Sequence, residues 1–196
     1  MSSETVRYTN VAIGLHWLIA LMLIGQIAGG WYMTHVPEPF SALQFQLYQL
    51  HKSFGLMVLF LSLIRLGWRL SHKVPGLPDG MKSWERIGAR ISHIGFYVLM
   101  IGVPLGGWAV VSASPFAESV PTLIFGVVPW PHLPFFVHVE DKQALYALIS
   151  RMHMVFAFTI LALFFLHVGA ALKHHFIVRD GVLARMAPFL RSRGNA

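Results

Sequence analysis

Four long apolar segments alternate with polar connections along the chain. The segments run from about 11 to 33, 48 to 70, 88 to 111 and 145 to 172. A helix of about twenty apolar residues crosses a hydrocarbon core of about 30 Å. Pro104 lies inside the third segment, where neighbouring membrane helices can satisfy the backbone group that it frees. The pattern predicts an all-α fold, an integral membrane four-helix bundle, with a single domain over residues 1–196.

The composition favours a membrane protein and excludes several kinds of site. The chain is 56% hydrophobic and only 12% charged, which leaves too little polar surface for a soluble domain. It contains no cysteine, so disulfides, thiolate zinc sites, cysteine-ligated iron–sulfur clusters and covalently attached haem are excluded. The net charge of +7 does not indicate nucleic-acid binding, because the basic residues flank apolar segments.

The basic residues are distributed unevenly among the connections. The first connection, "THVPEPFSALQFQ", contains no Lys or Arg, and basic residues near membrane helices are retained on the cytoplasmic side. We therefore expect both termini and the second connection to be cytoplasmic. The long third connection, roughly 112 to 144, is expected to form an ordered external cap with a short interfacial helix. The basic residues concerned are Arg69, Lys73, Lys82, Arg86 and Arg90 in the second connection, and Lys173, Arg179, Arg185, Arg191 and Arg193 in the tail.

Histidines occur inside the apolar segments, where polar side chains are costly and usually face the bundle interior. They are His16, His51, His93, His153 and His167. The last two are fourteen residues apart, so they share one helix face and lie about 21 Å apart along the axis. With the expected topology, His167 matches the depth of His16 near the cytoplasm, and His153 matches the depth of His51. One interpretation is hydrogen bonding between helices, and the other is two pairs of metal ligands.

Two pairs of facing histidines at two depths are typical of two b-type haems with two imidazole ligands each. The sequence predicts His16 with His167 and His51 with His153 as these pairs, and His93 is the alternative to His16. Zinc is a weaker interpretation, because zinc sites gather three or four ligands. Without cysteine the haems would be held non-covalently. Two histidines leave no open iron position, which favours electron transfer over oxygen binding.

Three further positions repeat the fourteen-residue interval. Arg65 follows His51 by fourteen residues, so we expect it at the depth of the cytoplasmic haem, where a haem propionate would be a suitable partner. Gly30 and Gly107 each follow a histidine of their own helix by the same interval. A glycine allows a flat macrocycle to approach a helix closely. The alternative role of these glycines is close packing between helices.

Four stretches resemble recurring segments of the bacterial cytochrome b561 family in the same order: "LHWLIALML", "LYQLHKSFGLMVLFLSLIRLGWRL", "WERIGARISHIGFYVLMIGVPLGGW" and "LHVGAALKHHFIVRDGVLARM". The resemblance covers nearly the whole chain. It implies a four-helix bundle in the bacterial inner membrane, two b haems on the same four axial histidines, and electron exchange with ubiquinone. Some family members are superoxide oxidases, which pass an electron from superoxide to ubiquinone. The third connection, "FAESVPTLIFGVVPWPHLPFFVHVED", departs from the family pattern and leaves the donor open.

Charged and polar residues near the two ends are candidates for the donor and quinone sites. A positive external rim would attract an anionic donor such as superoxide, and the alternative role of its residues is pairing with haem propionates or lipid headgroups. The predicted rim consists of Lys52, Lys142 and Arg151. A quinone site needs an apolar slot with a polar group at the quinone carbonyl. The cytoplasmic candidates for that group are His174, Arg69 and His93.

Three functions are compatible with these patterns. The first is an oxidoreductase that transfers electrons across the bilayer from an external donor to the quinone pool. The second is a haem-binding membrane anchor that relays electrons for a partner dehydrogenase or hydrogenase. The third is a structural four-helix protein without a cofactor. An absorbance spectrum separates the third from the others, and turnover by the purified chain separates the first from the second.

Overall fold

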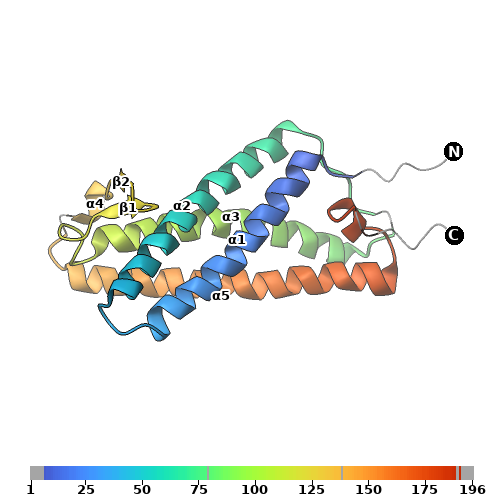
Figure 1. Ribbon diagram of the computed structural model, residues 1–196. Helices are drawn as coiled ribbons and strands as arrows, with labels where there is room; N and C mark the ends of the chain where they lie inside the picture. Colours follow the sequence, from blue (N-terminus) through green and yellow to red (C-terminus); the bar gives the residue numbers. More distant parts are fainter. Residues whose placement is uncertain (1–6, 79, 138, 189, 191–196) are drawn as a thin grey trace.

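The structure is a computed structural model that describes residues 7–78, 80–137, 139–188 and 190, so Arg191 and Arg193 lie outside the described residues. Its described part contains four helices that are long and apolar enough to cross a membrane (Figure 1). They are α1 (Asn10–His35), α2 (Ala42–Ser71), α3 (Ser83–Ala113) and α5 (Lys142–Lys173). The predicted all-α membrane fold is confirmed, and each predicted segment lies inside one of these helices.

The helices extend beyond the apolar segments because polar residues cap their first turns outside the hydrocarbon. The Thr9 hydroxyl accepts from the Ala12 amide at the start of α1, and the Ser41 hydroxyl accepts from the Gln44 amide at the start of α2. The Asp141 carboxylate accepts from the Ala144 amide at the start of α5. Such caps satisfy the free amides of a first turn. Helix α2 therefore starts at residue 42, although its apolar run starts near residue 48.

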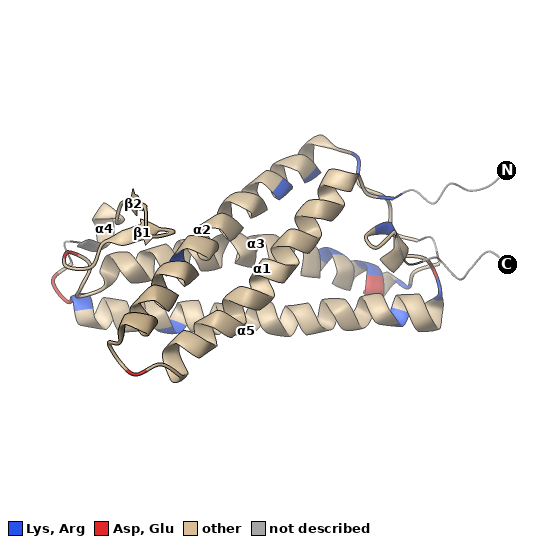
Figure 2. Ribbon diagram, in the orientation of Figure 1, with Lys and Arg blue, Asp and Glu red and all other residues tan. Residues whose placement is uncertain are grey.

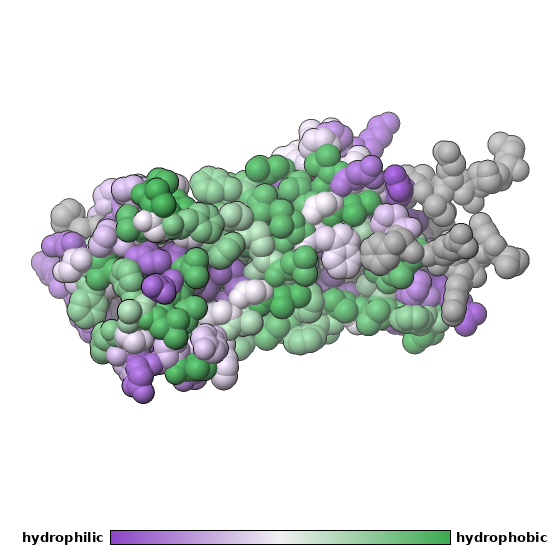
Figure 3. All heavy atoms as spheres, viewed as in Figure 1, coloured by the Kyte–Doolittle hydropathy of each residue, from purple (hydrophilic) through white to green (hydrophobic). Residues whose placement is uncertain are grey.

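The helices pack as two pairs, α1 with α2 and α3 with α5, and α2 also packs against α3. In Figure 1 the α1–α2 pair crosses the α3–α5 pair at an angle. Few large side chains are fully buried, and examples are Ile19 and Val58. Many apolar side chains face outward, and Figure 3 shows that hydrophobic residues dominate the middle of the visible face while hydrophilic residues gather toward its two ends. This surface is suited to lipid.

The connection between α3 and α5 folds into a small ordered cap. Strands β1 (Thr122–Ile124) and β2 (Val128–Trp130) pair antiparallel, and helix α4 (Pro134–Val137) follows. The Phe125 amide donates to the Ser53 hydroxyl of α2 at 2.8 Å. This hydrogen bond holds the hairpin over α2. We call this end of the bundle the hairpin end.

The opposite end, which we call the termini end, carries the first residues of α1 and α3 and the last residues of α2 and α5. Figure 2 shows many of the Lys and Arg residues of the described chain at this end. After α5 the chain forms a π-helical turn (His174–Val178) and a 3-10 turn (Leu183–Arg185). It then folds back onto α1, where the Trp17 indole N–H donates to the Met186 carbonyl at 2.8 Å.

Candidate functional site

Two pairs of histidines face each other inside the bundle. At the termini end, His16 of α1 and His167 of α5 have ring centroids 6.3 Å apart. At the hairpin end, His51 of α2 and His153 of α5 have ring centroids 6.3 Å apart as well. All four side chains are half-buried. The structure therefore brings together the two pairs that the depths of the residues predicted.

The separation of the rings fits a single metal ion between the members of each pair. A bond between a metal and an imidazole nitrogen is about 2.0–2.1 Å long, as in zinc sites. A ring nitrogen lies about 1.1 Å from the centre of its ring by covalent geometry. Two imidazoles on opposite sides of one metal therefore have centroids about 6.3 Å apart. The donor set of two neutral nitrogens per site suits haem iron.

The two ligand candidates at the hairpin end differ in whether their Nδ1 atom has a hydrogen-bond partner. The Nδ1 atom of His153 donates to the Val103 carbonyl of α3 at 3.0 Å. This bond leaves Nε2 of His153 to face a metal, because a second-shell acceptor fixes the tautomer of a ligand histidine. The Nδ1 atom of His51 is buried and has no hydrogen-bond partner among the described residues.

Two glycines make room for the imidazoles at the hairpin end. A Cβ atom built on Gly30 of α1 would lie 3.2 Å from Cε1 of His51. One built on Gly107 of α3 would lie 3.0 Å from Cε1 of His153. The sequence pointed to these glycines as positions where a macrocycle approaches a helix. In the structure each one also allows a histidine of the neighbouring helix to approach its backbone.

His93 of α3 is a second neighbour of His167 at the termini end. Their ring centroids are 5.9 Å apart, which is slightly closer than the His16–His167 pair. His93 thus remains the alternative partner by distance alone. The spacing of the His16–His167 pair equals that of the pair at the hairpin end, which favours His16.

Arg65 of α2 lies at the termini end, as its interval from His51 predicted. Its guanidinium carbon is 5.8 Å from the centroid of the Tyr97 ring. No carboxylate among the described residues pairs with it. A partly buried cation without an anionic partner is suited to a propionate.

A cavity of about 450 Å³ lies at the termini end, and His93 is one of its lining residues. It lies between the connection from α2 to α3 and the first turns of α3, and its size is in the usual range for small-ligand pockets. Arg69 and His93, two of the predicted quinone residues, both line it. Its other lining residues include Tyr8, Val74, Leu77, Arg86, Arg90 and Tyr97.

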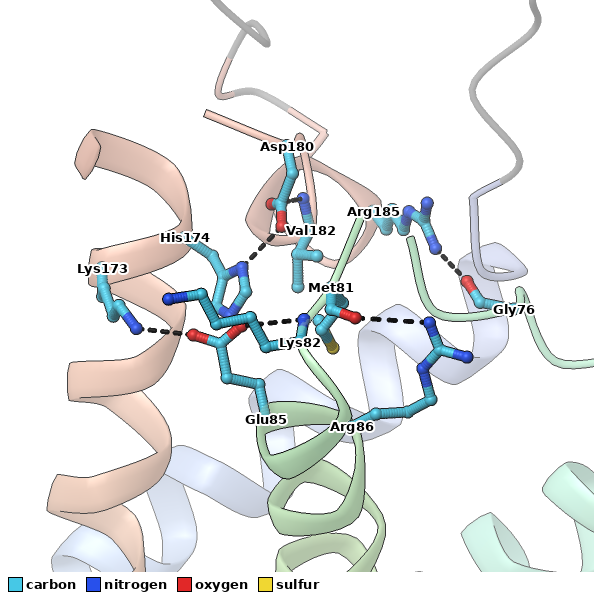
Figure 4. Close-up of polar contacts among 10 residues, drawn as sticks. All are labelled: Gly76, Met81, Lys82, Glu85, Arg86, Lys173, His174, Asp180, Val182 and Arg185. Atoms are coloured by element: carbon cyan, nitrogen blue, oxygen red, sulfur yellow. Dashed lines mark hydrogen bonds and ion pairs between the residues drawn. The ribbon is translucent and has the colours of Figure 1, made fainter. Parts of the chain in front are cut away.

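His174, the third predicted quinone residue, does not line this cavity. It is buried, and its Nδ1 atom lies 2.5 Å from a carboxylate oxygen of Asp180 (Figure 4). The neighbouring Lys173 pairs with Glu85 of α3 at 2.5 Å. The Lys173–Glu85 pair joins the end of α5 to the start of α3, and the His174–Asp180 contact holds the turn that follows α5.

Comparison with known proteins identifies the chain. The family model for prokaryotic cytochrome b561 matches residues 7–189. The chain belongs to the prokaryotic cytochrome b561 family. The resemblance seen in the sequence is therefore confirmed. As a member of this family, the chain is a bacterial multi-pass membrane protein that binds b-type haem and takes part in electron transfer.

Three relatives of this cytochrome b561 family member align over almost their whole length. Cytochrome b561 homolog 2 of Escherichia coli (strain K12) is 29% identical over 180 residues, which cover 92% of this chain and 90% of the relative. Cytochrome b561 homolog 1 of the same strain is 28% identical over 186 residues, with coverages of 93% and 97%. The probable superoxide oxidase CybB of Yersinia pestis is 27% identical over 185 residues, with coverages of 93% and 96%.

The predicted positive rim of this b561 cytochrome is divided in the structure. Lys142 forms an ion pair with Glu118 at 3.1 Å. Lys52 is half-buried and donates to the Thr122 hydroxyl of the hairpin at 3.4 Å. Arg151 is exposed and has no hydrogen bond or ion pair within the described part of the chain. Arg151 is therefore the rim residue whose charge is most available to a donor.

Sequence reasoning missed one polar residue of the site. Gln26 lies within α1, and its side-chain amide donates to the His51 backbone carbonyl at 2.9 Å. A Cβ atom built on Gly55 would lie 3.1 Å from the nitrogen of that amide. A signal was present, because an isolated Gln in an apolar membrane segment usually faces the bundle interior. The Val103 carbonyl that holds His153 gave no signal, since every residue has one.

Proposed function

We propose that this cytochrome binds two b haems non-covalently and transfers electrons across the bilayer from an external donor to a quinone. His51 and His153 would bind the iron at the hairpin end, and His16 and His167 the iron at the termini end. The equal centroid separation of 6.3 Å in the two pairs is the observation that carries this proposal. Haem iron held by two imidazoles supplies reversible one-electron transfer.

The orientation of the protein in the membrane, and so the direction of electron transfer, is inferred from the distribution of basic residues. Basic residues gather at the termini end, and such residues are retained in the cytoplasm. The termini end would then face the cytoplasm, and the hairpin end would face the outside. This orientation puts His51 and His153 near the donor, and His16 and His167 at the cytoplasmic end, where His93 lies between His167 and the cavity.

The cavity is the proposed quinone site. Arg69 can donate to a quinone carbonyl, and His93 can donate or accept a proton there. The His93 ring also lies 5.9 Å from that of His167, so it is close to both the cavity and a proposed iron ligand. Apolar residues such as Val74, Leu77 and Ile94 line the rest of the cavity and suit a lipid-soluble ring. A quinone takes up two electrons and two protons to become a quinol.

Superoxide is the proposed donor, with support from the printed function of one relative, the probable superoxide oxidase. Two superoxide anions lose one electron each and leave as molecular oxygen, which balances the reduction of one quinone to a quinol. Arg151, exposed at the hairpin end, would raise the local concentration of an anion.

A stopped-flow experiment tests this function. Purified protein in detergent is mixed with superoxide and a soluble quinone, and haem reduction and quinol formation are followed together. We expect both signals from the chain alone. If superoxide fails to reduce the haems and a co-purifying dehydrogenase or hydrogenase succeeds, the chain is a relay subunit for that partner instead.

A further inference from the structure

The two histidines at the hairpin end are oriented by different means. The Nδ1 atom of His153 is held by the Val103 carbonyl at 3.0 Å. The Nδ1 atom of His51 is buried without a hydrogen-bond partner among the described residues. Ligand histidines are normally oriented through this second nitrogen. His51 must therefore be oriented by other contacts.

Those contacts come from α1, the helix that packs against α2. The Gln26 amide nitrogen lies 2.9 Å from the His51 carbonyl oxygen and donates to it. Four residues further along α1, Gly30 faces the His51 ring, where an added Cβ would lie 3.2 Å from Cε1 and 3.6 Å from Nδ1. One contact ties the His51 carbonyl to α1, and the other borders the His51 imidazole.

Gly55 of α2 makes the Gln26 contact sterically possible. A Cβ at this position would lie 3.1 Å from the Gln26 amide nitrogen, which is closer than ordinary van der Waals contact at about 3.5–4.0 Å. The hydrogen bond from the Gln26 side chain lies inside an apolar membrane segment, where little water competes for it and an unpaired polar group is costly. The contact should therefore persist.

We propose that Gln26 is the positioning residue for His51. By holding the His51 carbonyl, with Gly55 providing the space and Gly30 bordering the ring, it sets the orientation of the imidazole toward the hairpin-end iron. Helix α1 then serves both proposed haem sites, one directly through His16 and the other indirectly through Gln26. This inference rests on the proposed function, because it requires His51 to be an iron ligand.

Two substitutions test it in the haem-loaded protein. Gln26→Met keeps the length of the side chain and removes the donor, whereas Gly55→Ala keeps the donor and displaces it. The matched control is Gly67→Ala, on the same helix, where an added Cβ has no atom within 4 Å. The readouts are the midpoint potential of each haem by optical redox titration and the electron paramagnetic resonance signal of each ferric haem.

We expect both variants to raise the potential of the same haem, the one that His51→Ala removes. A second-shell change alters metal affinity by about tenfold or more. A tenfold change in the ratio of ferric to ferrous affinity corresponds to about 59 mV for one electron. The other haem and the Gly67→Ala control should keep their potentials. The double variant Gln26→Met with Gly55→Ala should shift the potential no further than the larger single variant, because both substitutions act on the same contact between Gln26 and His51.

Several outcomes would overturn the inference. It is wrong if neither variant shifts a potential, if both haems shift equally, or if Gly67→Ala shifts as much as Gly55→Ala. If the Gln26→Met protein does not accumulate in cells, the potentials of Gly55→Ala alone decide whether the inference holds, since this variant adds only a single methyl group. A wild-type chain without two haems would instead refute the proposed function, which keeps the two failures distinguishable.

Discussion

Replacing Gly107 by alanine should selectively weaken haem binding at the hairpin end. The added Cβ would lie 3.0 Å from Cε1 and 3.4 Å from Nδ1 of His153, and ordinary carbon contacts lie at about 3.5–4.0 Å. The His153 ring cannot easily turn away, because its Nδ1 atom is hydrogen-bonded to the carbonyl of Val103, which lies on α3 together with Gly107. The imidazole must therefore shift by roughly 0.5–1 Å from the position that places it opposite His51.

The expected loss of haem affinity in Gly107→Ala follows from the free-energy cost of overpacking. Forcing a methyl group into a packed site costs about 1–3 kcal/mol, which corresponds to an approximately 5- to 150-fold loss of haem affinity. Gly102→Ala is the matched control, because it lies on α3 as well and an added Cβ has no atom within 4 Å. Alanine also favours the helix by about 1 kcal/mol over glycine, so the control should be at least as stable as the wild type.

The assay measures haem per chain by the pyridine haemochrome method during dilution or competition with a haem scavenger. We expect Gly107→Ala to lose one haem while the other stays bound, and Gly102→Ala to keep both. This role of Gly107 is excluded if Gly107→Ala keeps two haems with wild-type affinity. It is equally excluded if the haem lost is the one that depends on His16 and His167.

Two further predictions concern the donor and the quinone. Arg151→Gln should slow haem reduction by superoxide about twofold, since two unit charges 8 Å apart in water interact by about 0.5 kcal/mol. This difference should vanish in 1 M salt, where the Debye length falls to about 3 Å, and an unchanged rate at low salt would contradict it. Arg69→Gln should raise the KM for quinone about 10- to 150-fold, from a charge-assisted bond of about 1.5–3 kcal/mol, in steady-state assays. The control for both is Lys73→Gln, which removes an exposed charge at the termini end, and the quinone prediction fails if Lys73→Gln raises the KM as much.

The membrane fold could be predicted from the sequence because the signal is long and local. Twenty apolar residues are enough to indicate a spanning helix, but the helix starts after Ser41 and Asp141 mix apolar residues with Gln and Lys, so the apolar pattern does not locate them. The hairpin was predicted only as part of an ordered cap. Its strands β1 and β2 have three residues each, too few for an alternating pattern to emerge.

The histidine pairs could be predicted because helix rise converts residue number into depth. Depth alone could not decide between His16 and His93, which both lie near His167 in the structure. It also could not detect that Glu118 pairs with Lys142, because that contact depends on how the cap folds. The contact between Gln26 and His51 depends on the crossing of α1 and α2, which no local pattern encodes.

The pairing of the histidines is tested by removing them one at a time. Each of His16, His51, His153 and His167 is replaced by alanine, and the remaining haem is counted and identified by its midpoint potential. We expect two non-covalent b haems in the wild type. We also expect that His51→Ala and His153→Ala leave the same single haem, while His16→Ala and His167→Ala leave the other. One haem or none in the wild type, or a partnership between His93 and His167 with His16→Ala retaining both haems, would contradict this pairing.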